Sequence, residues 1–190
     1  MPEQVVPTVY FESPGPANTK RVLEIAGQRA AELGLRSIVV ATTRGETAVR
    51  ASQVLSGYRL VAVTHVTGFR EANLQELTPE NRRLLEQAGV SILTATHAFG
   101  GAGRAVRKKL GTYQVDEIIA HVLRLFGEGM KVAVEITLMA ADAGLVRTDE
   151  EVIAIAGTGR GADTAIVVRP ANTHNLFDLR ILEVLCRPRL

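Results

Sequence analysis

Ser37-Ile-Val-Val-Ala-Thr-Thr-Arg-Gly-Glu-Thr-Ala-Val-Arg50 is the stretch on which the fold and the function of this chain depend. It opens with an apolar run rich in β-branched residues, which indicates a buried strand, and it restarts after Gly45 as a helix. The turn between them, residues 42–47, is polar. Strand, glycine turn and helix form the geometry in which free main-chain N–H groups point at an anion. The pattern therefore predicts a phosphate-binding loop at this corner.

Side chains of the same turn add further donors. Threonine hydroxyls stand at three of its positions, and Arg44 adds a charge. An ordinary capped helix start would look the same, because threonine is common at caps, so both interpretations stay open here. The loop is not a Walker A loop, because no lysine follows the glycine. We expect valine at position 45 to weaken phosphate binding while leaving the fold largely intact. The candidate phosphate ligands are Thr42, Thr43, Arg44, Gly45, Glu46 and Thr47.

The totals favour one compact domain that spans residues 1–190, with 46% hydrophobic and 22% charged residues. A net charge of +2 is too small to indicate nucleic acid or an anionic membrane as the partner. The single cysteine, Cys186, lies in an apolar run, which favours a buried thiol. Without an internal disulfide or a recognisable targeting segment, we expect a cytoplasmic protein. A phosphorylated small molecule is the expected partner, and a homo-oligomer remains open.

Apolar strands alternate with amphipathic helices along the chain. This alternation predicts an α/β fold in three α/β/α layers with a mainly parallel sheet, and a hairpin or edge extension where the last strands follow one another. Residues 104–109 are basic and indicate a solvated turn or a short helix. Strands are expected at residues 5–11, 38–41, 60–63, 90–93, 151–156, 164–168 and 181–186, and helices at 18–33, from about 46 to 57, and at 78–89, 115–126 and 131–145.

Polar and glycine-rich turns follow Ala41, Val63, Leu93 and Ala156, at the carboxyl ends of four expected strands. Ligands of open α/β sheets bind beyond these ends, so the four turns are expected to line one crevice. Histidine at a strand end can act as an acid or base or hydrogen-bond a ligand, although a lone histidine is more often a polar loop residue. Thr64 with His65, and Thr96 with His97, are therefore candidates for the crevice wall.

Residues 157–163, Gly-Thr-Gly-Arg-Gly-Ala-Asp, are followed by a strand and not by the helix that a dinucleotide fingerprint needs. Their glycines permit a tight turn and close approach to a ligand or a neighbouring loop. Asp163 either accepts hydrogen bonds from sugar hydroxyls or stabilises the turn. Arg160 either neutralises phosphate or stands in solvent. On the expected helix at 131–145, Glu135 is expected to pair with Lys131 one turn earlier, and Asp142 to bond to nearby backbone.

The residues also carry a resemblance to a known family. Residues 38–48 with 60–64 resemble the C-terminal α/β domain of pyruvate kinase, whose loop in regulated enzymes grips a phosphate of a sugar bisphosphate. Thr42, Gly45, Thr47 and Ala48 match that loop, whereas Arg44 stands where a small hydroxyl residue is usual. The chain is more closely similar to stand-alone relatives of this domain. The motifs that carry this likeness are residues 10–15, 18–19, 96–97, 131–136, 139–144, 156–165 and 175–179.

The resemblance implies a pyruvate kinase C-terminal domain-like fold and a ligand in its crevice. The stand-alone relatives look like binders of flavin mononucleotide (FMN), so FMN is the implied cofactor. No pyruvate kinase activity is expected, because the catalytic barrel lies outside this domain. The alternatives are an FMN-dependent oxidoreductase, a phosphosugar-sensing regulatory protein, and a regulatory subunit that pairs with another protein. No catalytic residue and no metal ligand is assigned. The candidates for the crevice walls are Glu12, Thr64, His65, Thr96, His97, Gly159, Arg160 and Asp163.

Overall fold

Strand β2 (Ser37–Ala41) lies inside a single seven-stranded sheet in the computed structural model, which describes residues 3–189. It pairs in parallel with β3 (Arg59–Val63) on one side and with β5 (Val152–Ala156) on the other. Its side chains alternate between two hydrophobic cores, with Val40 in one and Val39 in the other. Burial on both faces explains why the strand is a continuous apolar run.

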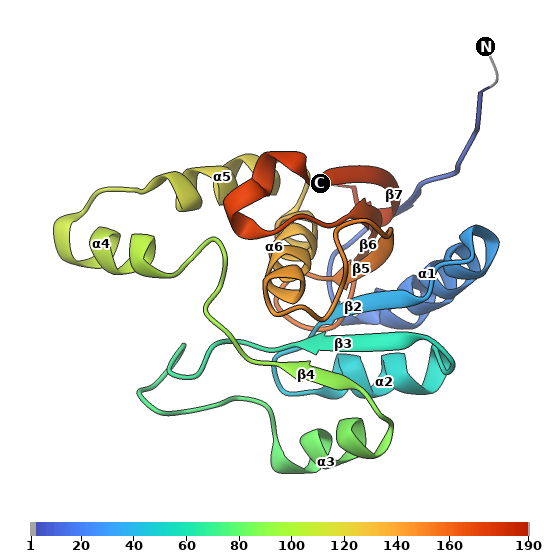
Figure 1. Cartoon of the computed structure of the whole chain (residues 1–190), viewed down its shortest axis with the longest axis horizontal. Coiled ribbons are helices and arrows are strands. Elements are labelled where there is room, and N and C mark those ends of the chain that lie inside the picture. The colour runs from blue at the N-terminus through green and yellow to red at the C-terminus, as the bar shows by residue number, and fades with distance from the viewer. Residues whose placement is uncertain (1–2, 190) are drawn as a thin grey trace.

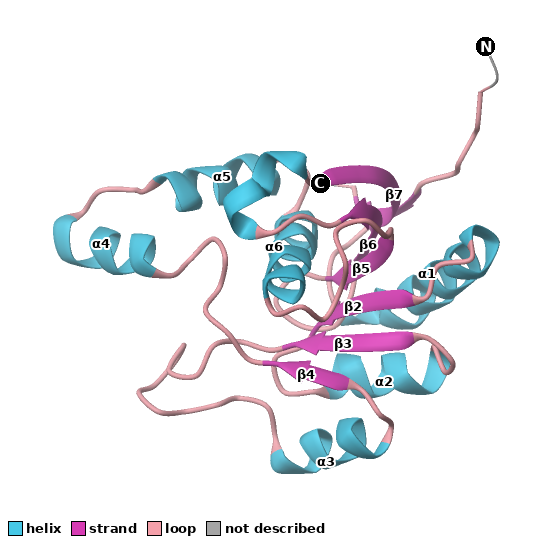
Figure 2. Ribbon diagram, viewed as in Figure 1, coloured by secondary structure: helices cyan, strands magenta, loops and turns pink. Residues whose placement is uncertain are grey.

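The strand order of the sheet is β1-β7-β6-β5-β2-β3-β4 (Figures 1 and 2). The other strands are β1 (Val9–Phe11), β4 (Ser91–Leu93), β6 (Thr164–Arg169) and β7 (Arg180–Pro188). Strand β6 pairs antiparallel with both of its neighbours, while the remaining pairs are parallel. The predicted mainly parallel sheet and the hairpin after β5 are both confirmed.

Helices cover both faces of the sheet and complete the predicted three layers. One core contains buried residues of α1 (Thr19–Leu33), α2 (Glu46–Val54) and α3 (Pro79–Gln87). The other core is built on α6 (Glu128–Asp142), with α5 (Val115–Arg124) packed beside it. Helix α4 (Ala102–Leu110) packs on α5, away from the sheet (Figure 1). Two short 3-10 helices, η1 (Pro16–Asn18) and η2 (Thr173–Asp178), complete the fold.

Local sequence signals explain several element ends. The Thr78 hydroxyl accepts a hydrogen bond from the Asn81 N–H at 3.2 Å, which caps α3 ahead of Pro79. Gly34 ends α1 in the left-handed conformation, at φ 65°. At the start of α1, Asn18 makes no side-chain cap, and the Thr19 hydroxyl accepts a hydrogen bond from the Ala162 N–H at 2.9 Å.

Two stretches depart from the sequence expectations at their edges. Residues 102–110 form a complete helix where a solvated turn or a short helix was expected. The helix ends at Gly111, which has a φ of 74°. The chain reverses there, so that α4 packs against α5. Strand β1 is three residues long, because only Val9–Phe11 pairs with β7.

Two surface and burial features complete the fold. Cys186 is fully buried, as expected, and burial raises the pKa of its thiol to about 12. Helix α5 leaves an apolar stripe exposed, made of Val115, Ile118, Val122 and Leu125. No helix among the described residues combines the length and the apolar character that crossing a membrane requires.

Candidate functional site

The α2 loop (residues 42–47) joins the carboxyl end of β2 to the start of α2. The Thr42 hydroxyl accepts a hydrogen bond from the Gly45 N–H at 3.1 Å and so closes the turn. Within residues 3–189, the N–H groups of Glu46, Thr47 and Ala48 have no acceptor. The hydroxyls of Thr43 and Thr47 likewise have no hydrogen-bond partner in this part of the chain. Together with the positive end of the helix dipole, these donors can bind an anion.

Gly45 is required at its position by the protein's own packing. It has a φ of 109°, and a Cβ atom there would lie 2.4 Å from the Asn81 Cβ and 2.9 Å from a methyl carbon of Leu77. This glycine therefore permits the close approach of Asn81 in α3 and of Leu77, the residue before the α3 cap. The expectation that valine at position 45 leaves the fold largely intact is wrong, because no room exists for its side chain.

The carbonyl of Arg44 fastens the α2 loop to α3. It accepts hydrogen bonds from the Thr78 N–H at 3.2 Å and from the Asn81 side-chain amide at 2.9 Å. The side chain of Arg44 is exposed and lies 3.6 Å from the equally exposed Glu46 carboxylate. Such a pair contributes little to stability, so the Arg44 guanidinium can turn toward a ligand without a large loss of folding free energy.

The glycine loop (residues 157–163) is held by Asp163. This carboxylate is fully buried and accepts hydrogen bonds from the N–H groups of Gly15 and Thr158, both at 3.0 Å, and from the Thr164 hydroxyl at 2.8 Å. Of the two roles that the sequence allowed, the structure therefore supports turn stabilisation. A ligand hydroxyl cannot reach Asp163 without displacing the protein's own donors.

The outer part of the glycine loop faces solvent. Gly159 and Arg160 are exposed, and Gly159 has a φ of 75° that favours glycine. Glu12 is also exposed and stands in the turn that the Gly15–Asp163 hydrogen bond ties to this loop. These three residues thus lie on neighbouring turns, while Thr96 is exposed on a different loop, after β4.

The carboxyl ends of β2, β3 and β4 lie side by side. The Thr42 N–H donates to the Val63 carbonyl, and the Thr64 N–H donates to the Leu93 carbonyl, each at 2.9 Å. The Thr64 hydroxyl is 2.7 Å from the Thr94 hydroxyl. The fold therefore places the α2 loop and the residues after β3 and β4 along one edge, as the parallel topology predicted.

His65 and His97 meet beyond this edge. Their ring centroids are 5.4 Å apart, and the ring of Phe69 lies 4.5 Å from that of His65 and 5.2 Å from that of His97. The Nδ1 of His65 is 2.8 Å from a carboxylate oxygen of Glu76. His97 Nε2 accepts a hydrogen bond from the Val66 N–H at 3.3 Å. Burial lowers the pKa of His97 to about 4, so its imidazole is neutral near pH 7 and can serve as an acceptor.

A buried ion pair supports the histidines from α6. Lys131 and Glu135 form the predicted pair one helical turn apart, and each side chain is only 5% exposed. The sequence did not indicate the next contact, in which the second Glu135 oxygen accepts from the Phe99 N–H at 3.0 Å. Phe99 lies two residues beyond His97, so this contact ties α6 to the loop that carries the histidine. The available signal was the pair Lys131 and Glu135 in the middle of a helix that is mostly apolar.

Asp142 also behaves as predicted at the end of α6. Its carboxylate accepts from the main-chain N–H of Thr173 at 2.9 Å, and from the side chains of Asn172 and Thr173. Although partial burial opposes this, these hydrogen bonds lower the pKa of Asp142. The residue fastens η2 to α6, so it has a structural role.

The family model described as "Pyruvate kinase, alpha/beta domain" matches residues 20–168 of this chain. Among solved structures, pyruvate kinase of Cryptosporidium parvum in complex with ADP is 19% identical over 84% of this chain and 25% of its own length, with a TM-score of 0.44. Another pyruvate kinase structure from this organism is 17% identical over 80% of this chain and 22% of its own, with a TM-score of 0.41. The chain thus spans about a quarter of the pyruvate kinases that it matches.

A third solved structure comes from a different enzyme. It is the NH3-dependent NAD synthetase of Campylobacter jejuni, solved in complex with the nitrate ion. The two chains are 13% identical over 72% of this chain and 54% of the synthetase, with a TM-score of 0.39.

Proposed function

Since the chain belongs to the pyruvate kinase alpha/beta domain family, we propose that it is a small-ligand-binding domain that holds a phosphate group on the α2 loop. The single observation that carries this proposal is the set of free donors at the start of α2. The N–H groups of Glu46, Thr47 and Ala48 and the hydroxyls of Thr43 and Thr47 have no acceptor within residues 3–189. Donors fixed around a helix N-terminus favour a phosphate over a neutral group.

The ligand that we propose is FMN. Its phosphate would lie on the α2 loop, and its flat ring system would lie toward His65, His97 and Phe69, whose rings contact one another at the neighbouring strand ends. Aromatic and imidazole faces pack well on a flat heterocycle. The exposed Arg44 and the outer glycine loop offer further polar contacts for the ribityl chain. Pyruvate kinase activity is not part of this proposal.

A Thr47→Val variant tests the phosphate contact without the packing problem of Gly45. Thr47 is 8% exposed, and valine keeps its shape while removing the hydroxyl. We expect the Kd for FMN, measured by fluorescence quenching, to rise at least fivefold, because a hydrogen bond to a charged group is worth about 1.5–3 kcal/mol. Thr148→Val, which removes an exposed hydroxyl elsewhere, is the matched control. An unchanged Kd in a Thr47→Val protein with a normal melting temperature would show that the phosphate does not bind to this loop.

A spectrum of the purified protein separates FMN from the alternatives. A bound flavin that is bleached by a reduced nicotinamide cofactor would make the protein an oxidoreductase. A bound flavin that is not bleached would leave it a binding protein. Stabilisation by sugar phosphates but not by FMN would make it a phosphosugar sensor and would contradict our choice of ligand.

One observation favours a second candidate function, a regulatory subunit that pairs with another protein. The stripe Val115, Ile118, Val122 and Leu125 leaves each side chain between 52% and 78% exposed on one face of α5. Contiguous apolar surface of this kind marks interaction sites. Ile118→Glu should then abolish complex formation while sparing FMN binding, which size-exclusion chromatography with light scattering would measure. A wild-type chain that stays monomeric and captures no partner would argue against this role.

A further inference from the structure

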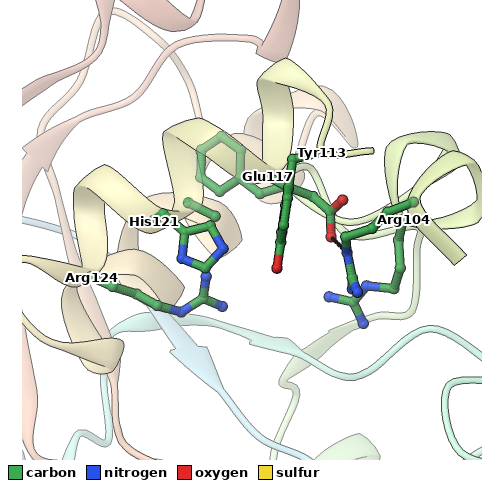
Figure 3. Close-up of a pocket in the computed structure, with 8 residues that line it drawn as sticks. Arg104, Tyr113, Glu117, His121 and Arg124 are labelled. Atoms are coloured by element: carbon green, nitrogen blue, oxygen red, sulfur yellow. Dashed lines mark hydrogen bonds and ion pairs between the residues drawn. The ribbon is translucent and has the colours of Figure 1, made fainter. Parts of the chain in front are cut away.

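Helices α4 and α5 enclose a cavity of about 220 Å³ that shares no residue with the α2 loop (Figure 3). Tyr113 stands in its middle, with His121 and Arg124 toward one end and Glu117 and Arg104 toward the other (Figure 3). The ring of Tyr113 contacts the ring of His121 at 5.4 Å between centroids, and the Arg107 guanidinium lies 5.3 Å from its centre. The lining residues are Phe99, Arg104, Arg107, Tyr113, Glu117, Ala120, His121 and Arg124.

The wall of this cavity carries an excess of positive charge. Three arginines face one glutamate across it. Arg107 Nε donates to Glu117 Oε1 at 2.7 Å, and Arg124 pairs with Glu128 outside the lining. Arg104 has no carboxylate partner within residues 3–189, and its guanidinium lies 5.1 Å from the centre of the Phe69 ring. The guanidinium of Arg104 is therefore available to bind an anion.

Two polar atoms of the wall lack hydrogen-bond partners among the described residues, although both are buried. They are Glu117 Oε2 and Arg104 Nε. The Glu117 side chain is 8% exposed, so water from the surface does not compensate its second oxygen. Leaving such a group unsatisfied costs about 1–3 kcal/mol, and more when it is charged. A carboxylate oxygen can only accept, so the missing partner of Glu117 is an O–H or N–H donor.

We propose that this cavity is a second ligand site, built for a compact phosphate monoester that also carries a hydroxyl group. The phosphate would pair with Arg104, because arginine forks match tetrahedral oxyanions. The hydroxyl would donate to Glu117 Oε2, and Tyr113 would pack on the carbon chain. The cavity volume of about 220 Å³ suits a three-carbon phosphate.

Glycerol 3-phosphate is the probe that tests the site by isothermal titration calorimetry. Propyl phosphate has the same phosphate and carbon chain without hydroxyls, and it should bind at least fivefold more weakly. Arg104→Gln should weaken glycerol 3-phosphate at least tenfold. Lys109→Gln removes the same charge from an exposed position of the same helix, so it is the matched control and should change the Kd less than twofold.

The ratio of the affinities for the two probes tests the role of Glu117. Glu117→Ala frees Arg107 for the phosphate, so this variant should still bind both probes, but with equal affinity, and the preference for glycerol 3-phosphate over propyl phosphate should be lost. That ratio is measured within one protein, so a change in overall stability does not affect it. Equal binding of the two probes by the wild-type protein would overturn the proposal. So would equal losses in Arg104→Gln and Lys109→Gln, or no binding at millimolar concentrations.

The test also separates this site from the α2 loop. Thr47→Val should leave the affinity for glycerol 3-phosphate unchanged, and Glu117→Ala should leave the affinity for FMN unchanged. If Thr47→Val removes glycerol 3-phosphate binding, the probe lies on the α2 loop and the cavity proposal fails. If FMN binding fails in every variant while glycerol 3-phosphate still depends on Arg104, only the function proposed for the α2 loop is lost.

Discussion

The glycine loop and the α4–α5 cavity differ in whether the protein itself satisfies the hydrogen bonds of their buried polar groups. In the glycine loop, the Asp163 carboxylate accepts three hydrogen bonds from the protein itself. In the cavity, Glu117 uses one oxygen for Arg107 and leaves the other without a partner among the described residues. The first region is complete without a ligand, while the second has a donor and an acceptor still to be satisfied.

This difference teaches which features of a motif point to a ligand. The glycines and the aspartate of residues 157–163 are the residue types of a binding loop, yet Gly161 is packed against Pro16 and Thr19 of the neighbouring turn. The basic run at 104–109 suggested solvent exposure, yet two of its residues, Arg104 and Arg107, line the cavity. Composition identifies the groups that can bind, but the hydrogen bonds that the protein already makes decide which of them are free.

The largest effect should come from Asp163→Ala, which tests whether the glycine loop is complete in itself. Removing the carboxylate leaves two main-chain N–H groups and a hydroxyl without their acceptor, so we expect the free energy of unfolding to fall by about 3–5 kcal/mol. Urea denaturation measures it. Asp178→Ala, at an exposed aspartate, should change it by less than about 0.5 kcal/mol. A loss below about 1 kcal/mol would mean that the loop does not depend on Asp163.

Gly45→Ala should cause the second-largest loss of stability, and it extends the comparison to the α2 loop. The new Cβ would meet Asn81 at 2.4 Å in addition to the strain of a φ of 109°, and we expect a loss of about 2–4 kcal/mol. Gly57→Ala is the matched control, because Gly57 has a φ of 95° but open space around it. It should cost only about 1 kcal/mol in the same urea titration. Equal losses in the two variants would show that α3 does not press on Gly45.

The smallest effect concerns His97, whose pKa is lowered by burial and also by His65, Lys131 and Arg104, against the opposing effect of Glu135. Burial lowers this pKa from 6.5 to about 4, so folding favours the neutral imidazole. Its contribution to stability is complete above pH 6.5 and is lost as the pH falls from 6.5 to 4. Between pH 7 and pH 4, the stability difference between wild type and His97→Gln should therefore shrink by about 1–3 kcal/mol.

Urea denaturation at several pH values checks this prediction. A His97→Gln curve parallel to that of the wild type would show that His97 titrates near its ordinary pKa and is not desolvated.

Much of the fold could be predicted from local pattern. The apolar run of β2, the threonine–proline start of α3 and the glycine after α1 each specify their element through interactions within a few residues. The pairing of Lys131 with Glu135 was predictable for the same reason, because residues four apart meet on one helix. The full length of α4 was not, since this helix packs on α5, beyond the turn at Gly111, and that contact does not show in the pattern of residues 104–109.

The sequence by itself determined the alternation of strands and helices, and hence the parallel sheet, the common edge of its loops and the family. It also determined which residue types stand at that edge, because the strand ends are readable from hydrophobic pattern. Only the tertiary structure decided which of them are free. Asp163 meets Gly15, 148 residues away, Gly45 meets Asn81 of α3, and Arg107 of α4 meets Glu117 of α5. Hydrogen bonds and steric contacts act through space, so their partners do not show in the local order of residues.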